Sequence, residues 1–512
     1  EKLTKAAMGM LGDPRFAKVD DKTAINSNAV NHIQHKRGDV EKGFAEADVV
    51  LERTFTTSTV HQGYIEPQTS TADAHSDGQL TIYTSTQGHF AARQMTASLL
   101  HVPLSKVKVV PTEIGGGFGG KTTIYMEPIA ALLSMKSGLP VRMVMTRKEV
   151  FEATGPASAA HVKMKIGVKN DGTITAMQAW MAFESGAYPG GWSTPAAKCV
   201  FGPYKCDNML IDGYDVVTNT TKVIAYRAPS SPQAMFATEG LLDELCTELK
   251  MDPLEFRLKN ATKEGDIQSD GVPFPKIGLI ETLNAVKASE HWKSPKPTGP
   301  NQGRGIASGF WMNGGMQSSA IVNINADGTA SVITGSVDIG GSRASMAMMA
   351  AEVLGLKAEE VRPQVADTDS IGHTDTTGGS RTTFATGKAV YEAAMDAVVE
   401  MKKRVAILWD TQEDNIGFAS GTFTDRDGKR TITLKELAPK LTPTGGPVQG
   451  RWAWTASGVG PGFGVHVADV EVDPDTGKVT ILRYTAAQDV GTAIHPDYVE
   501  GQFQGGAVQG IG

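Results

Sequence analysis

A glycine string followed by Lys and Thr is the part of the chain that most strongly suggests chemistry. Residues 115–122 read Gly-Gly-Gly-Phe-Gly-Gly-Lys-Thr, which satisfies the G-x-x-x-x-G-K-T pattern of phosphate-binding loops. In such a loop, backbone N–H groups hold phosphate oxygens and the lysine adds positive charge. Taken alone, the string indicates an ATPase.

Three features of the surrounding sequence disfavour a nucleotide triphosphatase. Pro111-Thr112-Glu113 separates the string from the preceding strand-like run, whereas the NTPase strand runs directly into its loop. The upstream sequence reads as antiparallel strands rather than as part of a doubly wound sheet. Val470–Asp473, the nearest match to a strand that ends in a magnesium-binding Asp, belongs to a hairpin. The NTPase remains an alternative.

Further short segments combine glycine with hydroxyl, amide or charged residues. Glycine makes up 57 of the 512 residues without a G-x-y period, which favours a large ligand held by many loops. The segments are Tyr83-Thr84-Ser85-Thr86-Gln87, Ala225-Tyr226-Arg227-Ala228-Pro229, Asp338-Ile339-Gly340-Gly341-Ser342, Gly378-Gly379-Ser380-Arg381-Thr382-Thr383, Asp489-Val490-Gly491, and Gly501-Gln502 through Gln509-Gly510.

Together with residues 114–121, these segments resemble, in the same order, the cofactor loops of the xanthine oxidase family of molybdenum hydroxylases. Each segment is short, but their shared order extends over residues 50–512. The chain therefore looks like the molybdenum-binding subunit of that family, which also includes aldehyde oxidoreductases and aerobic carbon monoxide dehydrogenases.

The resemblance implies a molybdopterin cofactor, in bacteria usually the cytosine dinucleotide form. Its metal is held by the pterin dithiolene, so no direct protein ligand to molybdenum is expected. The implied reaction hydroxylates an electron-poor carbon with oxygen from water, and electrons then leave through 2Fe-2S centres to FAD. The chain has only three cysteines, too few for a four-cysteine cluster, so an iron–sulfur subunit and an FAD subunit are expected as partners.

The resemblance also assigns roles to individual residues. It places Gln87 as an amide donor beside the apical oxo group, Gly117 and Phe118 facing the metal, and Arg227 as a charged donor near the molybdenum centre. Two further segments are expected to bind phosphate through N–H groups, hydroxyls and one guanidinium. They comprise Gly340, Gly341 and Ser342, and Ser380, Arg381 and Thr382.

Departures from the family pattern narrow the substrate, which is expected to be a small molecule. Thr122 stands where purine-oxidising relatives have Glu, and Pro229 stands where they have a stacking aromatic residue. Ala228 stands where carbon monoxide dehydrogenases carry a copper-binding cysteine. Xanthine and carbon monoxide are therefore disfavoured, which leaves an aldehyde, an N-heteroaromatic or an aromatic thioester. Thr122, Pro229, Phe310 and Trp311 are expected to line the substrate pocket.

The general base expected from the resemblance is not found in the chain. In the family it is a glutamate in a Gly-Glu-Pro-Pro-type segment, and the only similar string, Gly458-Val459-Gly460-Pro461, has no Glu. We therefore expect either a companion polypeptide that carries the glutamate or a partial chain, and no activity from this chain alone. A non-catalytic cofactor-binding scaffold of the same fold is a second alternative.

Composition excludes several other classes. The net charge is −7 with Lys and Arg scattered singly, which argues against nucleic-acid binding. No stretch approaches the ~18–20 apolar residues of a membrane span. An odd number of cysteines, Cys199, Cys206 and Cys246, fits a reducing compartment, so a cytoplasmic location is expected.

Alternating strand and helix patterns predict an α+β fold with mixed or antiparallel sheets and packed helices. Hairpin signals lie at 170–172, 326–328 and 475–477, and helices are expected to begin near Ser231, Asp252, Ser342 and Gly387. The Pro-rich segment 295–301 predicts a boundary. We expect a lead-in segment (1–50) and two elongated cofactor-binding halves (51–295 and 302–512).

Overall fold

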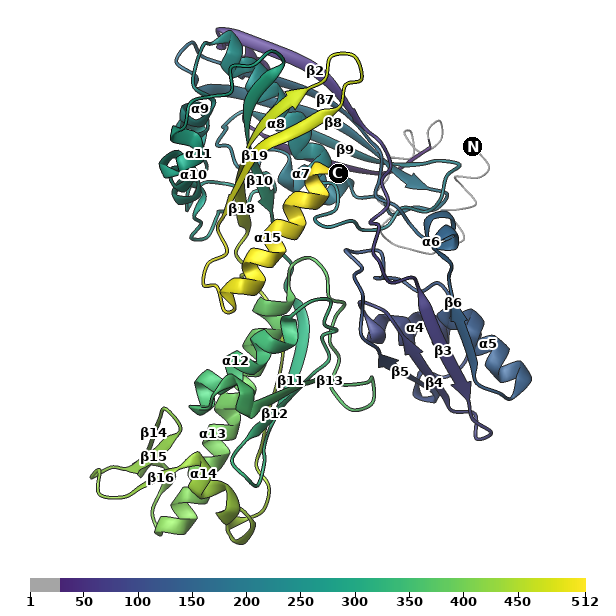
Figure 1. Ribbon diagram of the computed structural model, residues 1–512, viewed down its shortest axis with the longest axis vertical. Helices are drawn as coiled ribbons and strands as arrows, with labels where there is room; N and C mark the ends of the chain where they lie inside the picture. The colour runs from purple at the N-terminus through teal and green to yellow at the C-terminus, as the bar shows by residue number, and fades with distance from the viewer. Residues whose placement is uncertain (1–27) are drawn as a thin grey trace.

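The computed structural model describes residues 28–512 and forms three lobes. A large lobe holds the N-terminal strands and, over them, strands from the end of the chain (Figure 1). A small lobe and a helical lobe extend from it side by side (Figure 1). The small lobe and the helical lobe are in contact where Gln87 donates to Thr377.

The large lobe is built on a five-stranded sheet in the order β1-β9-β8-β7-β2, in which only β8 and β9 are parallel. Helices α7 and α8 cover one face, and inward-facing side chains of β7 and β8 meet Leu241 and Leu245 of α8 there. The elements are β1 (Ala29–Arg37), α3 (Val40–Ala45), β2 (Val49–Thr57), β7 (Ala160–Val168), β8 (Ile174–Gly186), α7 (Ser193–Cys199), β9 (Met209–Val217) and α8 (Ser231–Glu248).

The small lobe has a four-stranded sheet in the order β5-β4-β3-β6. Its helix α5 packs inward through the small residues Ala130 and Ala131, while Leu132 and Leu133 are exposed. The elements are β3 (Thr69–Ala74), β4 (Leu80–Thr84), α4 (His89–Leu100), β5 (Val107–Pro111), α5 (Glu127–Ser137), β6 (Val141–Val144) and α6 (Arg147–Ala153).

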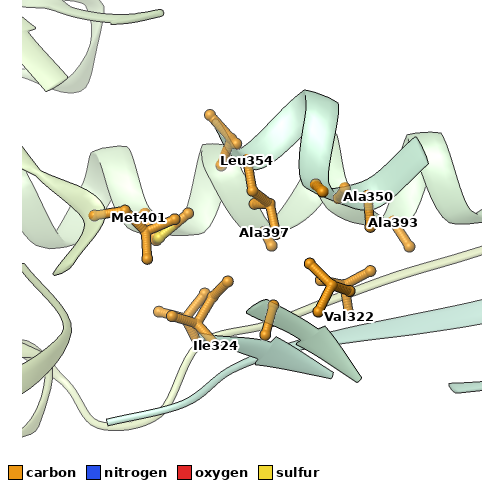
Figure 2. Packing of buried hydrophobic residues seen from close by; sticks show 14 of the residues in the cluster. Val322, Ile324, Ala350, Leu354, Ala393, Ala397 and Met401 are labelled. Carbon is orange, nitrogen blue, oxygen red and sulfur yellow. The ribbon is translucent and has the colours of Figure 1, made fainter. Parts of the chain in front are cut away.

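In the helical lobe, two helices lie across a four-stranded sheet. Figure 2 shows Val322 and Ile324 of β11 facing Ala350 and Leu354 of α12, with alanines of α13 that let the helices approach closely. The elements are β11 (Met316–Ile324), β12 (Ala330–Thr334), α12 (Ser342–Leu354), β13 (Val361–Val365), α13 (Gly387–Trp409), β14 (Ile416–Ala419), β15 (Thr422–Asp425), β16 (Thr431–Thr433), α14 (Leu434–Leu437) and β17 (Gln449–Ala456).

A three-stranded sheet, β10-β18-β19, joins the end of the chain to the large lobe. Leu279 and Leu283 of α10 pack on Ile306 and Phe463 of this sheet, so one core crosses the connection at 295–301. The predicted boundary between two cofactor-binding halves at residues 295–301 thus stays a prediction. The elements are α9 (Pro253–Asn260), α10 (Leu279–Ala288), α11 (Glu290–Lys293), β10 (Gln302–Trp311), β18 (Gly462–Val472), β19 (Val479–Gln488) and α15 (Pro496–Ile511).

The predicted α+β class is confirmed, with mixed and antiparallel sheets. The three hairpin signals connect β7 to β8, β11 to β12 and β18 to β19. On α8, Phe236 is 56% exposed, whereas Leu241 and Leu245 are buried. Residues 1–27 of the predicted lead-in lie outside the described residues. Within residues 28–512, no helix is long and apolar enough to cross a membrane.

Candidate cofactor-binding site

The glycine string forms an irregular loop between β5 and α5. Three of its residues have positive φ: Gly116 at 89°, Phe118 at 52° and Gly119 at 105°. A positive φ is costly for Phe118, because its Cβ crowds the backbone. Strain of this kind is kept where the surrounding structure holds it in place, often at a ligand site.

Lys121 of this loop points into the protein. Its side chain is fully buried, and its Nζ lies 2.6 Å from Glu66 Oε2. The helix that a phosphate-binding loop requires does not start at Lys121, because α5 begins at Glu127. The lysine is thus not free to reach a phosphate, and the NTPase alternative is wrong.

The middle of the loop offers backbone donors. In the described part of the chain, the N–H groups of Gly116, Gly117 and Phe118 donate no hydrogen bond. Gly117 leaves no room for a larger residue, since a Cβ there would lie 2.5 Å from Gln87 Oε1. Successive free N–H groups on a close-fitting loop are suited to an anionic or oxygen-rich ligand, so the loop fits such a group.

Gln87 lies under this loop, 2% exposed, three residues after β4. Its Oε1 accepts from Gly119 N at 2.9 Å and Lys121 N at 3.2 Å. Its Nε2 donates to Thr377 O at 2.8 Å, which ties the small lobe to the helical lobe. The second Nε2 hydrogen has no acceptor in the described residues, so the predicted donation to a ligand stays a prediction.

Arg227 connects the glycine loop to α15. Its backbone N–H donates to Phe118 O at 2.8 Å, and its guanidinium donates to Gln502 O at 2.6 Å and Gln509 Oε1 at 3.1 Å. Burial lowers the pKa of this guanidinium. The next residues are also strained, with φ at 58° for Ala228 and 64° for Ser230.

Three amides at the start of α12, those of Gly340, Ser342 and Arg343, already donate to one carboxylate. Asp338 Oδ1 accepts from Gly340 N at 2.8 Å and Ser342 N at 3.1 Å, and its Oδ2 accepts from Arg343 N at 3.1 Å. Burial of the Asp338 carboxyl acts to raise its pKa, but these hydrogen bonds outweigh burial and lower it. The amides of Gly340 and Ser342 thus already have an internal acceptor, and the predicted phosphate contact of Gly340, Gly341 and Ser342 stays a prediction.

Gly341 packs closely against α15. A Cβ at this position would lie 2.4 Å from the Tyr498 ring of α15. The glycine is thus explained by close packing between α12 and α15, with φ at 89°.

Arg381 also turns away from the predicted phosphate. It is 1% exposed, and its guanidinium donates to Gly315 O at 2.8 Å, Asp375 O at 3.1 Å and Ser318 Oγ at 2.5 Å. These buried oxygens already use donors of the guanidinium, and the expected phosphate contact from this side chain stays a prediction.

The backbone of the same segment nevertheless fits an anion. No described residue accepts a hydrogen bond from the N–H groups of residues 378–381, and Gly379 and Ser380 have φ at 66° and 59°. Thr382 Oγ1 is buried without a partner. The segment directly precedes a π-helical turn, Thr382–Thr386, and α13. The segment therefore lies at the N-terminal, positive end of these helices, where free amides can bind an anion.

A cleft of about 1200 Å³ begins at this segment. Ser380, Thr383, Asn313 and Gln488 are among the residues that line it. Lys388 and Tyr391 of α13 also line it. The cleft is large enough for an extended polar ligand whose anionic part meets residues 378–382.

Of the four predicted pocket residues, Phe310 is misplaced. It is 4% exposed in the core, with its ring 5.1 Å from that of Phe463, because β10 directs it inward. Trp311 is half-buried against the same core. Thr122 Oγ1 donates to Gly119 O at 2.9 Å, and Pro229 is half-buried beside Arg227. For Thr122, Pro229 and Trp311, a substrate contact stays a prediction.

Sequence reasoning missed Glu66, Asp338 and Thr377 as organisers of the site. The Asp-x-Gly-Gly-Ser spacing before α12 was a signal for Asp338, since Asp is a preferred helix cap. Glu66 and Thr377 act through the tertiary structure, and no local pattern marks them. Within residues 28–512, no group of three His, Cys, Asp or Glu side chains could hold a metal ion.

Comparison with known proteins matches both parts of the chain to one family. Residues 22–261 and 281–512 each match a family described as molybdopterin cofactor-binding domain. The xanthine dehydrogenase molybdenum-binding subunit of Escherichia coli O157:H7 is 29% identical over 98% of this chain. The chain spans 70% of that relative's length.

Solved structures show the same fold. The aldehyde oxidoreductase of Desulfovibrio gigas is 27% identical, with a TM-score of 0.82 over 97% of this chain and 55% of its own. Quinoline 2-oxidoreductase from Pseudomonas putida 86 has a TM-score of 0.85 at 23% identity, over 98% of this chain and 68% of its own. The second likeness concerns the fold alone.

Proposed function

The chain belongs to the xanthine oxidase family of molybdenum hydroxylases, a family of oxidoreductases, as a molybdopterin cofactor-binding chain. From this premise we propose that it is the cofactor-binding subunit of an enzyme that hydroxylates an electron-poor carbon with oxygen from water. The observation that carries the proposal is the strained glycine loop, whose three free N–H groups lie between Gln87 and Arg227.

When bound, the molybdenum cofactor supplies the redox chemistry and the activated oxygen. The chain's own residues would hold it: the amides of Gly116, Gly117 and Phe118 are free to donate to an oxygen-rich ligand, and Gln87 would add one side-chain N–H. The half-buried Phe118 ring excludes water from this point. Arg227 fixes the Phe118 carbonyl and α15, so that the loop keeps its shape.

We also propose the cytosine dinucleotide form of the cofactor. Its support is the cleft of about 1200 Å³ that Ser380 lines, because Ser380 belongs to the segment 378–381 whose amides are free. A pyrophosphate at these amides would place a nucleotide within the cleft, beside Lys388 and Tyr391. Release of cytidine monophosphate on mild acid hydrolysis would test this form.

Partner subunits with 2Fe-2S and FAD groups form part of the proposal. The E. coli relative is named a molybdenum-binding subunit, which implies a complex in that organism. The described cysteines of this chain, Cys199, Cys206 and Cys246, are free and buried, so they are poor candidates for a cluster. Burial also raises the pKa of the Cys199 thiol to about 12, which suits an inert thiol in a reducing, cytoplasmic setting.

The general base is proposed to come from a companion polypeptide. The carboxylates beside the glycine loop are already engaged: Glu66 with Lys121, and Glu113 with Arg343 through bonds of 2.8 and 2.7 Å. A base must be free to accept a proton within hydrogen-bond reach of the substrate. A glutamate that approaches the loops at 115–120 and 225–229 from another polypeptide would satisfy this need.

The proposed substrate classes follow from Thr122 and Pro229, which stand where purine-oxidising relatives have a Glu and a stacking aromatic residue. Thr122 uses its hydroxyl on Gly119 O and brings no carboxylate to the site. Pro229 offers no ring for stacking. An aldehyde, an N-heteroaromatic or an aromatic thioester therefore suits the site better than xanthine or carbon monoxide.

The proposal can be tested on the purified complex in water labelled with heavy oxygen. One substrate from each of the three classes is offered with an artificial electron acceptor, and the product is analysed by mass spectrometry. Label in the product of one class supports the proposal. A complex that holds the cofactor but turns over no class would instead support a non-catalytic scaffold.

A further inference from the structure

One carboxylate oxygen holds both ends of the glycine loop. Glu66 Oε2 accepts from Gly115 N at 2.8 Å and from Lys121 Nζ at 2.6 Å. The Glu66 backbone N–H also donates to Gly115 O at 3.1 Å. Glu66 lies between β2 and β3, outside the loop, so a distant part of the chain closes residues 115–121.

The pair is buried on the lysine side. The Lys121 side chain is 0% exposed and the Glu66 side chain 29%. Burial lowers the pKa of Lys121 and Glu66 raises it, while the Arg147 charge lowers it further. The Tyr64 ring also faces the ammonium, with its centroid 5.1 Å from Nζ. Glu66 is thus the carboxylate that keeps this lysine charged.

Buried ion pairs are weak sources of stability, because apolar residues of similar size often serve equally well. A purely stabilising role would therefore leave the pair unexplained. Its geometry supplies a different role, since both partners bind the loop itself. A Cβ at Gly115 would lie 2.5 Å from Glu66 Cβ, so the loop approaches Glu66 as closely as it can.

The backbone of Lys121 transmits this hold to the site. Lys121 O accepts from Gln87 N at 2.8 Å, and Lys121 N donates to Gln87 Oε1. Residues 116–118, with the free N–H groups, lie between the two anchored ends. A shift at either end therefore moves these groups and the Gln87 amide together.

We infer that Glu66 is the positioning residue of the glycine loop and that Lys121 is its internal counterion rather than a phosphate ligand. The inference rests on the proposed function, in which the loop contacts the cofactor. Glu66 touches neither cofactor nor substrate. It acts by holding the N–H groups of residues 116–118 in the geometry that the cofactor needs.

The test compares Glu66→Gln with the double variant Glu66→Gln/Lys121→Met, both in the full complex. Glu255→Gln is the matched control, because the Glu255–Lys287 pair has the same 2.6 Å separation but is half-exposed on other helices. The measurements are cofactor content, thermal midpoint, kcat and KM, the Mo(V) electron paramagnetic resonance line shape, and deuterium uptake of a peptide covering 115–121 in cofactor-free chain.

We expect Glu66→Gln to lower kcat by about 10- to 100-fold with KM within about twofold, as for a misplaced reacting geometry. Its Mo(V) line shape should broaden, and its 115–121 peptide should take up deuterium faster. The double variant, without the unpaired ammonium, should regain the thermal midpoint but neither kcat nor the line shape. The control should match wild type throughout.

Two results would overturn the inference: a wild-type line shape, kcat and uptake in Glu66→Gln, or recovery of kcat together with stability in the double variant. A wild-type complex without molybdopterin would instead end the proposed function. The deuterium uptake needs no cofactor, so it still decides whether Glu66 fixes the loop.

Discussion

At the residue scale, the glycine loop depends on side chains that several hydrogen bonds hold in one conformation. Gln87 uses three of its hydrogen-bonding positions inside the protein, and the Arg227 side chain binds α15 on one side while its backbone binds Phe118 on the other. Side chains fixed in this way pre-organise a site, because little conformational entropy is lost when the ligand binds.

Arg227→Ala should reduce molybdenum content or activity far more than thermal stability. The variant removes the hydrogen bonds from the Arg227 guanidinium to Gln502 and Gln509 of α15, but it removes little buried apolar surface. Metal analysis, turnover and a thermal melt of the complex measure the two effects. Arg142→Ala, at an exposed position of β6, is the control. Wild-type cofactor content and turnover in Arg227→Ala would contradict the assignment.

Gly117→Ala should impair cofactor retention, because the new Cβ would lie 2.5 Å from Gln87 Oε1 and displace that amide. Gly303→Ala in β10 is the matched control, since nothing lies within 4 Å of a Cβ there. The molybdenum-to-protein ratio after gel filtration is the measurement. Equal ratios in both variants would show that Gln87 does not set the loop.

The buried His89 should lower the free energy of unfolding of the chain in acid. Burial lowers its pKa to about 4 from 6.5, opposed by the Asp367 charge and aided by that of His373. Below pH 6.5 the unfolded chain binds a proton that the native state does not take until about pH 4, so stability falls across this window. At pH 5 the expected cost is about 2 kcal/mol.

The measurement for His89 is the unfolding free energy of wild type and His89→Phe at pH 7 and pH 5. His35, His61 and His466 also have pKa values lowered by burial, so wild type loses stability through several groups. The difference between the two proteins isolates His89. The same pH dependence in both would assign the acid loss to the other histidines.

At the element scale, the sequence predicted which loops form the site better than it predicted where their side chains point. The segments 85–87, 115–121, 225–229 and 378–383 converge as their shared order implied, because strand and helix ends place them. The orientation of the Arg381 side chain and the burial of Phe310 depend on residues far away in the sequence, such as Gly315 and Phe463. No local pattern contains that information. Asp338 differs, because it accepts from amides only two to five residues further along the chain.

Asp338→Ala should destabilise the chain by about 1–2 kcal/mol without lowering cofactor content, because Asp338 caps α12 internally. Asp252→Ala on α9 is the matched control, since Asp252 also accepts from two helix N–H groups. Urea unfolding and metal analysis separate the effects. Loss of cofactor from Asp338→Ala with an unchanged free energy of unfolding would contradict this prediction and indicate that the start of α12 binds the cofactor.

At the scale of the whole molecule, the three lobes are tied together around the glycine loop. Gln87 bonds to Thr377, Thr368 bonds to Val109, and Arg227 bonds to α15. The cofactor site is therefore made of segments far apart in the sequence. This explains why the order of the loops in the sequence could identify the family, whereas it could not identify the substrate.

The isolated chain, loaded with cofactor, should not oxidise substrate. Two carboxylates beside its glycine loop, Glu66 and Glu113, are paired with Lys121 and Arg343, and the base is proposed to lie on the companion polypeptide. Turnover should appear when the companion polypeptide is added. Equal rates with and without the companion would place the base on this chain.

The central claim is that the loops of this chain hold molybdopterin. The direct measurement is molybdenum by elemental analysis and pterin by fluorescence after release, on the complex purified without added nucleotide. The account predicts molybdenum and pterin in equal amounts, close to one of each per chain. Stoichiometric ATP with neither molybdenum nor pterin would contradict it.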